Sequence, residues 1–360
     1  MKYHQIDLKE GTMLLPIVPD VRKVYIEASS LCNFSCITCM RHSWEDSQTY
    51  LSWELFSKFL QDAKELPDLT TIHFGGFGEP FTNPNLLAMV RAAKDAGYQV
   101  EMITNGSYLT PAVCQELVDI GLDWIFVSLD GPDSASFEQI RPGSSYDEVS
   151  ANIRELQRIK EERQSSVPQL GIEFVATKQN INKFAGMGKV IRSLKADQII
   201  VTNVLPYHSN MKDEILYGGP TEEINLSLYF MTMPIKTMPN MKLFSDKNCK
   251  FMDTKALAIT AAGEVCPCYA LMHTYTCFIL GREKKMFAHS FGNIGDRTIK
   301  DIWTDERYMR FRWIVRNNRY PSCIDCRLAD GCVLTNESDC WGNEPSCGDC
   351  LWSRNIVMCP

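Results

Sequence analysis

The stretch LCNFSCITCM, residues 31–40, places three cysteines in the spacing C-x3-C-x2-C. They are Cys32, Cys36 and Cys39. Four thiolates would complete a tetrahedral metal site, so this loop leaves one ligand position open. Three thiolates can hold three irons of a [4Fe-4S] cluster and leave the fourth iron free for another ligand. The loop therefore predicts an iron–sulfur site with an open iron; the alternatives are an incomplete zinc site or three unrelated thiols.

The composition is that of an ordinary globular chain of 360 residues, 45% hydrophobic and 22% charged. The formal net charge is -7 and there is no long basic run, which argues against nucleic acid or an anionic membrane surface as the main partner. No window approaches the roughly 18 apolar residues of a membrane span, and no secretory signal is apparent. We expect a cytoplasmic protein that binds small molecules or peptides.

From Val24 onward, short β-branched runs alternate with amphipathic stretches of helix length, the pattern of parallel strands joined by crossover helices. The expected strands are residues 24–29, 71–76, 100–105, 124–130, 171–177 and 199–205, and the expected helices are residues 52–65, 84–96, 110–120, 146–163 and 182–195. Six such units predict an α/β fold, a partial (β/α)6 barrel of the TIM type. In such barrels the loops that follow the strands share one face and carry the chemistry.

The cysteines are concentrated at the two ends of the chain. Of the fifteen, three lie at 32–39, one is Cys114, and eleven lie between 249 and 359. A reducing cytosol keeps thiols available to metals, so we expect a cysteine-rich domain held by metals rather than by a large apolar core, and a core position for Cys114. The expected division of the chain is an N-terminal extension, the barrel, a linker and the cysteine-rich domain, at residues 1–20, 21–218, 219–248 and 249–360.

The three-cysteine loop after a first strand resembles the defining motif of the radical SAM superfamily, and the resemblance covers residues 24 to 217. It implies that Cys32, Cys36 and Cys39 hold a [4Fe-4S] cluster whose open iron binds the amine and carboxylate of S-adenosylmethionine (SAM). One-electron reduction would then cleave SAM, and a 5′-deoxyadenosyl radical would abstract hydrogen from the substrate. A one-electron donor such as ferredoxin or flavodoxin is an implied partner.

Other loops resemble the SAM-binding motifs of that family. GGFGEP, residues 75–80, resembles the motif whose glycine carbonyls and acidic side chain receive the SAM ammonium. TNGS, SLDG, IRPG and VLPY stand where the family contacts the ribose, the carboxylate and the adenine. The implied SAM-binding residues are Gly75, Gly76, Gly78, Glu79, Thr104, Asn105, Ser128, Asp130, Arg141, Val204 and Tyr207. The alternatives are plain turns at TNG and LDG and a solvated surface position for Arg141.

The cysteine-rich end resembles the SPASM domain, which carries two auxiliary iron–sulfur clusters. The resemblance implies two further clusters, expected to be [4Fe-4S]. One would be held by Cys323, Cys326 and Cys332 with a tail cysteine, the other by Cys249, Cys268 and Cys340, and the remaining candidates are Cys347, Cys350, Cys359, Cys266 and Cys277. The two C-x2-C pairs also have the spacing of a structural zinc ribbon, which stays open as an alternative.

The tail CIDCRLADGC and the loop GGFGEP, among other stretches, resemble one subgroup over nearly the whole chain: the radical SAM maturases encoded beside tungsten-dependent aldehyde oxidoreductases. The implied function is radical modification of a peptide or protein side chain, a cross-link or an oxidation, linked to that tungsten oxidoreductase. One alternative is modification of the small-molecule tungsten-pterin cofactor; another is a non-catalytic iron–sulfur carrier or zinc scaffold. Tyr269 replaces the aspartate base of some SPASM enzymes and is the one catalytic candidate.

Overall fold

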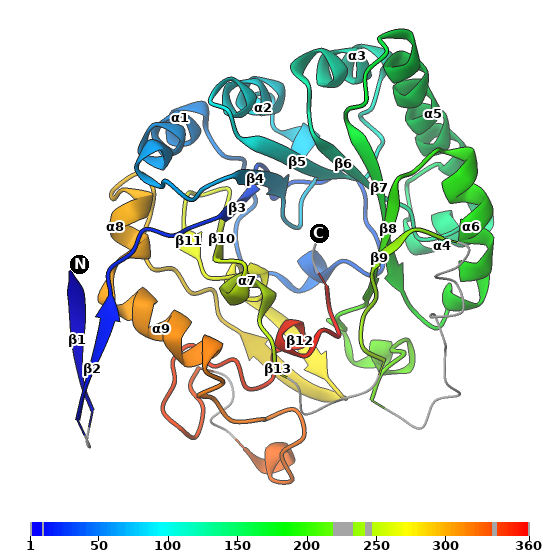
Figure 1. The fold of residues 1–360 in the computed structure, drawn as a ribbon. Helices are drawn as coiled ribbons and strands as arrows, with labels where there is room; N and C mark the ends of the chain where they lie inside the picture. Colours follow the sequence, from blue (N-terminus) through cyan, green and yellow to red (C-terminus); the bar gives the residue numbers. More distant parts are fainter. Residues whose placement is uncertain (1, 9–10, 219–232, 242–246, 333–336, 359–360) are drawn as a thin grey trace.

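Six consecutive β/α units form the body of the protein (Figure 1). The computed structural model describes residues 2–8, 11–218, 233–241, 247–332 and 337–358. The strands of the six units are β3 (Lys23–Glu27), β4 (Thr71–Gly75), β5 (Gln99–Thr104), β6 (Trp124–Ser128), β7 (Gln169–Ala176) and β8 (Gln198–Asn203). The helices between them are α1 (Trp53–Asp62), α2 (Leu86–Asp95), α3 (Pro111–Ile120), α4 (Ser134–Ile140), α5 (Tyr146–Glu162) and α6 (Phe184–Ser193). The predicted strands and helices are confirmed, with shifted ends, and the short α4 is additional.

Side chains at the helix starts explain several of these boundaries. Ser52, Thr110 and Ser145 each accept a hydrogen bond from a backbone N–H of the first turn of α1, α3 and α5. Such caps satisfy donors that the helix itself leaves unpaired. The helices then cover the outside of the strands, as the ring in Figure 1 shows.

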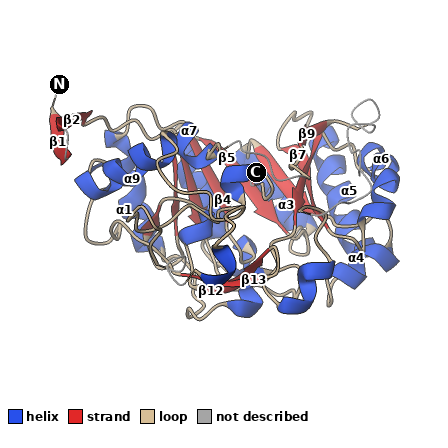
Figure 2. Cartoon of the chain, turned by 90° about the horizontal axis from the view of Figure 1, so that it is seen from below, coloured by secondary structure: helices blue, strands red, loops and turns tan. Residues whose placement is uncertain are grey.

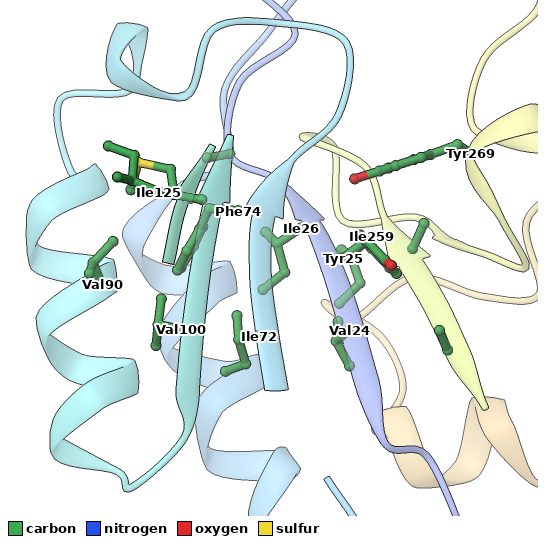
Figure 3. Close-up of a cluster of buried hydrophobic side chains, with 14 of the residues drawn as sticks. Val24, Tyr25, Ile26, Ile72, Phe74, Val90, Val100, Ile125, Ile259 and Tyr269 are labelled. Carbon is green, nitrogen blue, oxygen red and sulfur yellow. The ribbon is translucent and has the colours of Figure 1, made fainter. Parts of the chain in front are cut away.

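The sheet continues beyond the six units at both edges. In the described residues it has nine strands in the order β11-β10-β3-β4-β5-β6-β7-β8-β9. The added strands are β9 (Ile235–Thr237), β10 (Ala256–Ile259) and β11 (Val265–Cys266). β10 runs parallel to β3, so the cysteine-rich part of the chain shares the sheet of the barrel. Figure 3 shows Ile259 of β10 beside Val24 and Tyr25 of β3.

The expectation that the cysteine-rich end lacks a large apolar core is wrong for its first half. Helices α8 (Ile299–Trp303) and α9 (Glu306–Arg316) bury Trp303 and Tyr308 in the same hydrophobic cluster as Phe74 of the barrel. The physical reason is β10, which brings this segment onto the edge of the barrel and gives its helices an apolar surface to cover. Cys114 in α3 is fully buried, as predicted.

The remaining elements lie around the open side of the barrel. They are the hairpin of β1 (Tyr3–Leu8) and β2 (Gly11–Pro16), helix α7 (Lys250–Asp253), and the hairpin of β12 (Tyr275–Ile279) and β13 (Arg282–Met286). Figure 2 shows the first hairpin at one end of the molecule, near α9. Within the described residues, no helix has the length and apolar character needed to span a membrane.

Candidate active site

A cavity of about 220 Å³ lies at the carboxyl ends of the barrel strands. Cys32, Cys36 and Cys39 line it, and so do residues from the loops that follow successive strands. Of the expected SAM-binding residues, those that line it are Gly76, Gly78, Glu79, Thr104, Asn105, Ser128, Arg141 and Val204. The fold thus brings most of the predicted residues to one place, although they are scattered over the sequence.

The three thiols of the cysteine loop are close enough to influence one another. Burial raises the pKa of Cys39 to about 11, and the thiols of Cys36 and Cys32 contribute to the rise. Two hydrogen-bond donors face this group: Asn105 Nδ2 lies 3.8 Å from Cys32 Sγ, and Arg141 lies 3.7 Å from Cys36 Sγ. Donors near the sulfurs stabilise thiolates, the form that binds iron. The loop therefore fits the cluster that the sequence predicts.

Glu79 is a buried carboxylate that is held in place from three sides. Its Oε1 accepts hydrogen bonds from the Thr104 hydroxyl at 2.8 Å and from the Phe81 N–H at 3.1 Å. Its Oε2 accepts one from the Asn105 N–H at 2.7 Å. Burial raises the pKa of Glu79 to about 7, although these donors oppose the shift. A cation beside it would restore the charged form, so Glu79 fits the ammonium group of SAM.

The glycines of the GGFGEP loop allow close approach of the chain. A Cβ at Gly78 would come within 2.1 Å of the Ser29 carbonyl oxygen, and Gly76 has a φ of +116°, which side chains disfavour. Gly75, in contrast, ends β4 and does not line the cavity. The predicted contact between Gly75 and SAM is therefore not supported by this geometry.

Asp130 and Arg141 form a buried ion pair in the cavity wall. Arg141 Nε donates to Asp130 Oδ2 at 2.8 Å, and the Val175 N–H donates to Asp130 Oδ1 at 2.8 Å. Burial alone would lower the pKa of Arg141, but Asp130, Cys36 and Glu173 outweigh it, so the pKa is raised. Asp130 itself does not line the cavity. Asp130 holds Arg141 in one orientation, and the positive charge of Arg141 lies at the cavity.

Tyr207 also departs from its expected place. Its hydroxyl donates to the Ile37 carbonyl at 3.0 Å, and the ring is absent from the cavity lining, where Leu205 stands beside Val204 instead. Tyr207 therefore holds the cysteine loop through Ile37, and Val204 and Leu205 form the apolar wall of the cavity at this point.

The cysteines of the C-terminal part fall into two groups. Burial raises the pKa of Cys268, and the thiols of Cys350, Cys249 and Cys347 raise it further. We call these four the inner cysteine set: Cys249, Cys268, Cys347 and Cys350. We call Cys323, Cys326, Cys332 and Cys340 the outer cysteine set; Cys266 and Cys277 are buried and belong to neither set.

Two observations favour the outer cysteine set. The Cys340 thiol contributes to the raised pKa of Cys323, and the Cys326 N–H donates to the Cys323 carbonyl at 3.3 Å. Cys347 and Cys350, rather than the expected Cys340, are the thiols that act on Cys268 together with Cys249. The pairing of Cys340 with Cys249 and Cys268 stays a prediction. Cys359 lies outside the described residues.

Within the described ranges, no three His, Cys, Asp or Glu side chains converge closely enough to hold a single metal ion. This holds for Cys32, Cys36 and Cys39 as well as for the C-x2-C pairs at 323–326 and 347–350. The zinc ribbon therefore stays an alternative to the auxiliary clusters.

Comparison with known proteins gives the family. The family model of the Radical SAM superfamily matches residues 26–166, and that of SPASM, an iron–sulfur cluster-binding domain, matches residues 249–327. The tungsten-containing aldehyde ferredoxin oxidoreductase cofactor-modifying protein of Pyrococcus furiosus is 39% identical over 348 residues, which cover 94% of this chain and 97% of the relative. The chain is a radical SAM enzyme with a SPASM domain. The family implies iron–sulfur clusters and SAM as its cofactors.

More distant relatives share the same architecture. A PqqA peptide cyclase of Streptomyces rochei is 24% identical over 356 residues, 92% of this chain and 91% of the relative. Two solved structures show the same fold at 15% identity. SuiB of Streptococcus suis bound to the precursor peptide SuiA has a TM-score of 0.60 and covers 88% of this chain and 72% of its own. Native anSMEcpe with bound AdoMet has a TM-score of 0.58, with 93% of both chains covered.

Glu173 of this radical SAM enzyme was missed by the sequence analysis. It lines the cavity from β7, and the Ser128 hydroxyl donates to its Oε2 at 3.3 Å. Burial raises the pKa of Glu173 to about 7. The signal was in the sequence: GIEFVA places one acidic residue in an otherwise apolar strand, and buried acidic residues are rare without a partner or a role.

The chain end forms another unpredicted wall. Trp352, Val357 and Met358 line the cavity, and Figure 1 shows the C-terminal end at the centre of the ring of strands. The tail is held by β8, because the Met358 N–H donates to the Thr202 hydroxyl at 2.8 Å. No sequence pattern predicts that the tail lines the cavity, because this position depends on contacts between residues far apart in the chain. Tyr269, the catalytic candidate, also lines the cavity.

Proposed function

We propose that this enzyme cleaves SAM reductively and oxidises a side chain of a peptide or protein, by a cross-link or a dehydrogenation, in connection with a tungsten-dependent oxidoreductase. The observation that carries the proposal is the shared cavity. The cysteine loop lines it, and so do Tyr269 and Trp352, which follow Cys268 and Cys350 of the inner cysteine set by one and two positions. A SAM site and an auxiliary site that border one substrate space suit a two-electron oxidation.

The proposed SAM site is divided among four kinds of residue. Cys32, Cys36 and Cys39 would hold the first cluster, Glu79 would accept the ammonium group, and Arg141 would meet the carboxylate with its planar fork. Thr104, Asn105 and Asp130 orient those two charged side chains. When bound, the cluster and SAM supply a 5′-deoxyadenosyl radical that takes one hydrogen atom from the substrate. The buried walls of the cavity keep water away from it.

The substrate radical must then lose one electron and one proton to give a product two hydrogens lighter. The inner cysteine set would hold an auxiliary cluster that supplies a one-electron acceptor. We propose that Glu173 takes the proton at a carboxylate oxygen, because it faces the cavity and a pKa of about 7 suits a general base. This assignment replaces Tyr269, whose ring packs 5.7 Å from Phe77 and 5.1 Å from Tyr25; we assign Tyr269 to the cavity wall.

Relatives support a peptide substrate. The PqqA peptide cyclase of Streptomyces rochei is named for a peptide and matches 92% of this chain, and SuiB was solved with a precursor peptide. A one-electron donor of the ferredoxin or flavodoxin type is the proposed source of electrons for the first cluster.

A second candidate is oxidation of the pterin of the tungsten cofactor. The relative from Pyrococcus furiosus, at 39% identity, is named a cofactor-modifying protein. The tail also favours a compact substrate, because Val357 and Met358 line the cavity and limit its space. An extended peptide would have to enter from the face of the loops.

One experiment separates the two candidates. The anaerobically reconstituted enzyme is incubated with SAM, a reductant and either short peptides encoded beside it or tungsten-pterin precursors, each deuterated. The proposal predicts deuterium in 5′-deoxyadenosine from the deuterated peptide and, from unlabelled peptide, a product about two mass units lighter, since two hydrogens leave by the scheme above. Deuterium that arrives only from the pterin would establish the second candidate.

A further inference from the structure

A buried lysine lies against the loop that carries two cysteines of the inner set. Lys284 on β13 is 3% exposed, and its Nζ donates to Asp349 Oδ2 at 3.1 Å. Asp349 stands between Cys347 and Cys350. Arg282, two positions before Lys284 on the same strand, donates to Asp349 Oδ1 at 2.8 Å. Lys284 and Arg282 therefore both bond to the turn between Cys347 and Cys350, the two residues that would be cluster ligands.

The same strand also reaches the outer cysteine set. Arg282 donates to the Cys323 carbonyl at 3.3 Å. The hydrogen bond of Lys284, in contrast, goes to Asp349, which stands between Cys347 and Cys350 of the inner set. Lys284 therefore contacts the turn of the inner set, while Arg282 contacts both sets.

A buried charge of this kind affects the reduction of an iron–sulfur cluster. Four thiolates make a cluster site negative, and reduction adds one more negative charge. A fixed cation nearby stabilises the reduced form and raises the reduction potential. The effect is large where water cannot screen it, and Lys284 is shielded from water.

We propose that Lys284 raises the reduction potential of the cluster held by the inner cysteine set relative to that of the outer set. The electron from the substrate would then settle first on the cluster that borders the cavity. This inference rests on the proposed function, because it takes both cysteine sets as cluster ligands. Lys284 acts through charge and touches neither substrate nor SAM, so it is a positioning residue.

The test is an anaerobic redox titration followed by electron paramagnetic resonance, in a background where Cys32, Cys36 and Cys39 are alanine. Signals then come from the auxiliary clusters alone. Lys284→Gln should shift one auxiliary midpoint to a more negative potential and leave the other nearly unmoved. Lys284→Arg keeps the charge and should keep the wild-type midpoint. Lys285→Gln is the matched control, because Lys285 is the next residue of β13 but is 37% exposed and pairs with Glu45.

Iron content is measured alongside each midpoint. Unmoved midpoints in Lys284→Gln, with about eight irons retained as two four-iron clusters, would overturn the inference and leave the proposed function intact. Should Lys284→Gln lose iron, Asp349→Asn gives the opposite test: removal of the counter-charge should shift the inner midpoint to a more positive potential, and any other result overturns the inference. Absence of auxiliary iron from every protein, wild type included, would remove the proposed clusters themselves.

Discussion

Arg141 Nε lies 2.8 Å from Asp130 Oδ2, and both side chains are buried, but only Arg141 lines the cavity. The pair joins the loop after β6, which carries Asp130, to the end of α4, where Arg141 stands. Arg141 Nη1 lies 3.7 Å from Cys36 Sγ. Asp130 thus holds the charge that we propose for the SAM carboxylate.

The first prediction concerns this pair. Asp130→Asn should lower the free energy of unfolding by roughly 3–5 kcal/mol, because it leaves the Arg141 charge buried without a partner. Chemical denaturation measures the change. The control is Glu116→Gln, which breaks the exposed pair with Arg91 and should cost about 0–1 kcal/mol. Equal losses of unfolding free energy in the two variants would contradict the claim that the buried Asp130–Arg141 pair stabilises the fold more than an exposed pair does.

The second prediction is a pH dependence of SAM binding. The pKa of Glu79 is raised to about 7, and only the carboxylate form attracts the ammonium of SAM. Affinity should therefore be highest near pH 7.5, between the pKa of Glu79 and that of a free α-amino group at about 8, and fall as the pH drops through 7, by roughly tenfold per pH unit well below it. Binding isotherms from pH 6 to pH 8.5 measure this. Glu79→Gln should bind weakly at every pH, and a wild-type affinity that is equal at pH 6 and pH 8 would contradict the assignment.

The third prediction concerns the proton acceptor. Glu173→Gln should still bind and cleave SAM but form roughly 10²–10⁴-fold less product per 5′-deoxyadenosine, the range of general-base contributions. Product and 5′-deoxyadenosine are quantified in the same reaction. Should SAM affinity fall while the ratio of product to 5′-deoxyadenosine stays unchanged, Glu173 would be a SAM ligand and not the base.

The fourth prediction tests the proposed grouping of cysteines into an inner and an outer set. The wild type should hold about twelve irons, three clusters of four. The double variants Cys249→Ala/Cys268→Ala and Cys347→Ala/Cys350→Ala should each lose about four irons, and combining them should lose no more, because all four thiols serve one cluster. Additive losses of about eight irons would instead favour the pairing of Cys340 with Cys249.

The sequence predicted what depends on local pattern. Alternating runs predicted the six strands of the barrel, whose loops meet on one face. Spacing predicted the iron–sulfur role of Cys32, and the resemblance to radical SAM motifs predicted Glu79 and Arg141. It did not predict β10, whose pairing with β3 joins residues more than two hundred positions apart, nor the tail at Met358. Such contacts depend on how distant segments pack, and spacing along the chain carries little information about them.

The expected roles of Asp130 and Tyr207 show that a motif does not specify which neighbour a polar side chain contacts. The family resemblance implied that both contact the ligand, but neither lines the cavity, and their polar groups bond to Arg141 and to the Ile37 carbonyl. Whether a polar side chain meets the ligand or supports a neighbour is decided by its direction, which the motif does not specify.

The central claim is that the three thiolates of the cysteine loop support radical cleavage of SAM. The most direct measurement is the yield of 5′-deoxyadenosine from anaerobically reconstituted protein with SAM and a strong reductant. The wild type should form 5′-deoxyadenosine, and the Cys32→Ala/Cys36→Ala/Cys39→Ala variant should form none while it retains about eight auxiliary irons as two four-iron clusters. Wild-type protein that carries its full iron content and forms no 5′-deoxyadenosine, or a triple variant that forms as much as the wild type, would contradict the account.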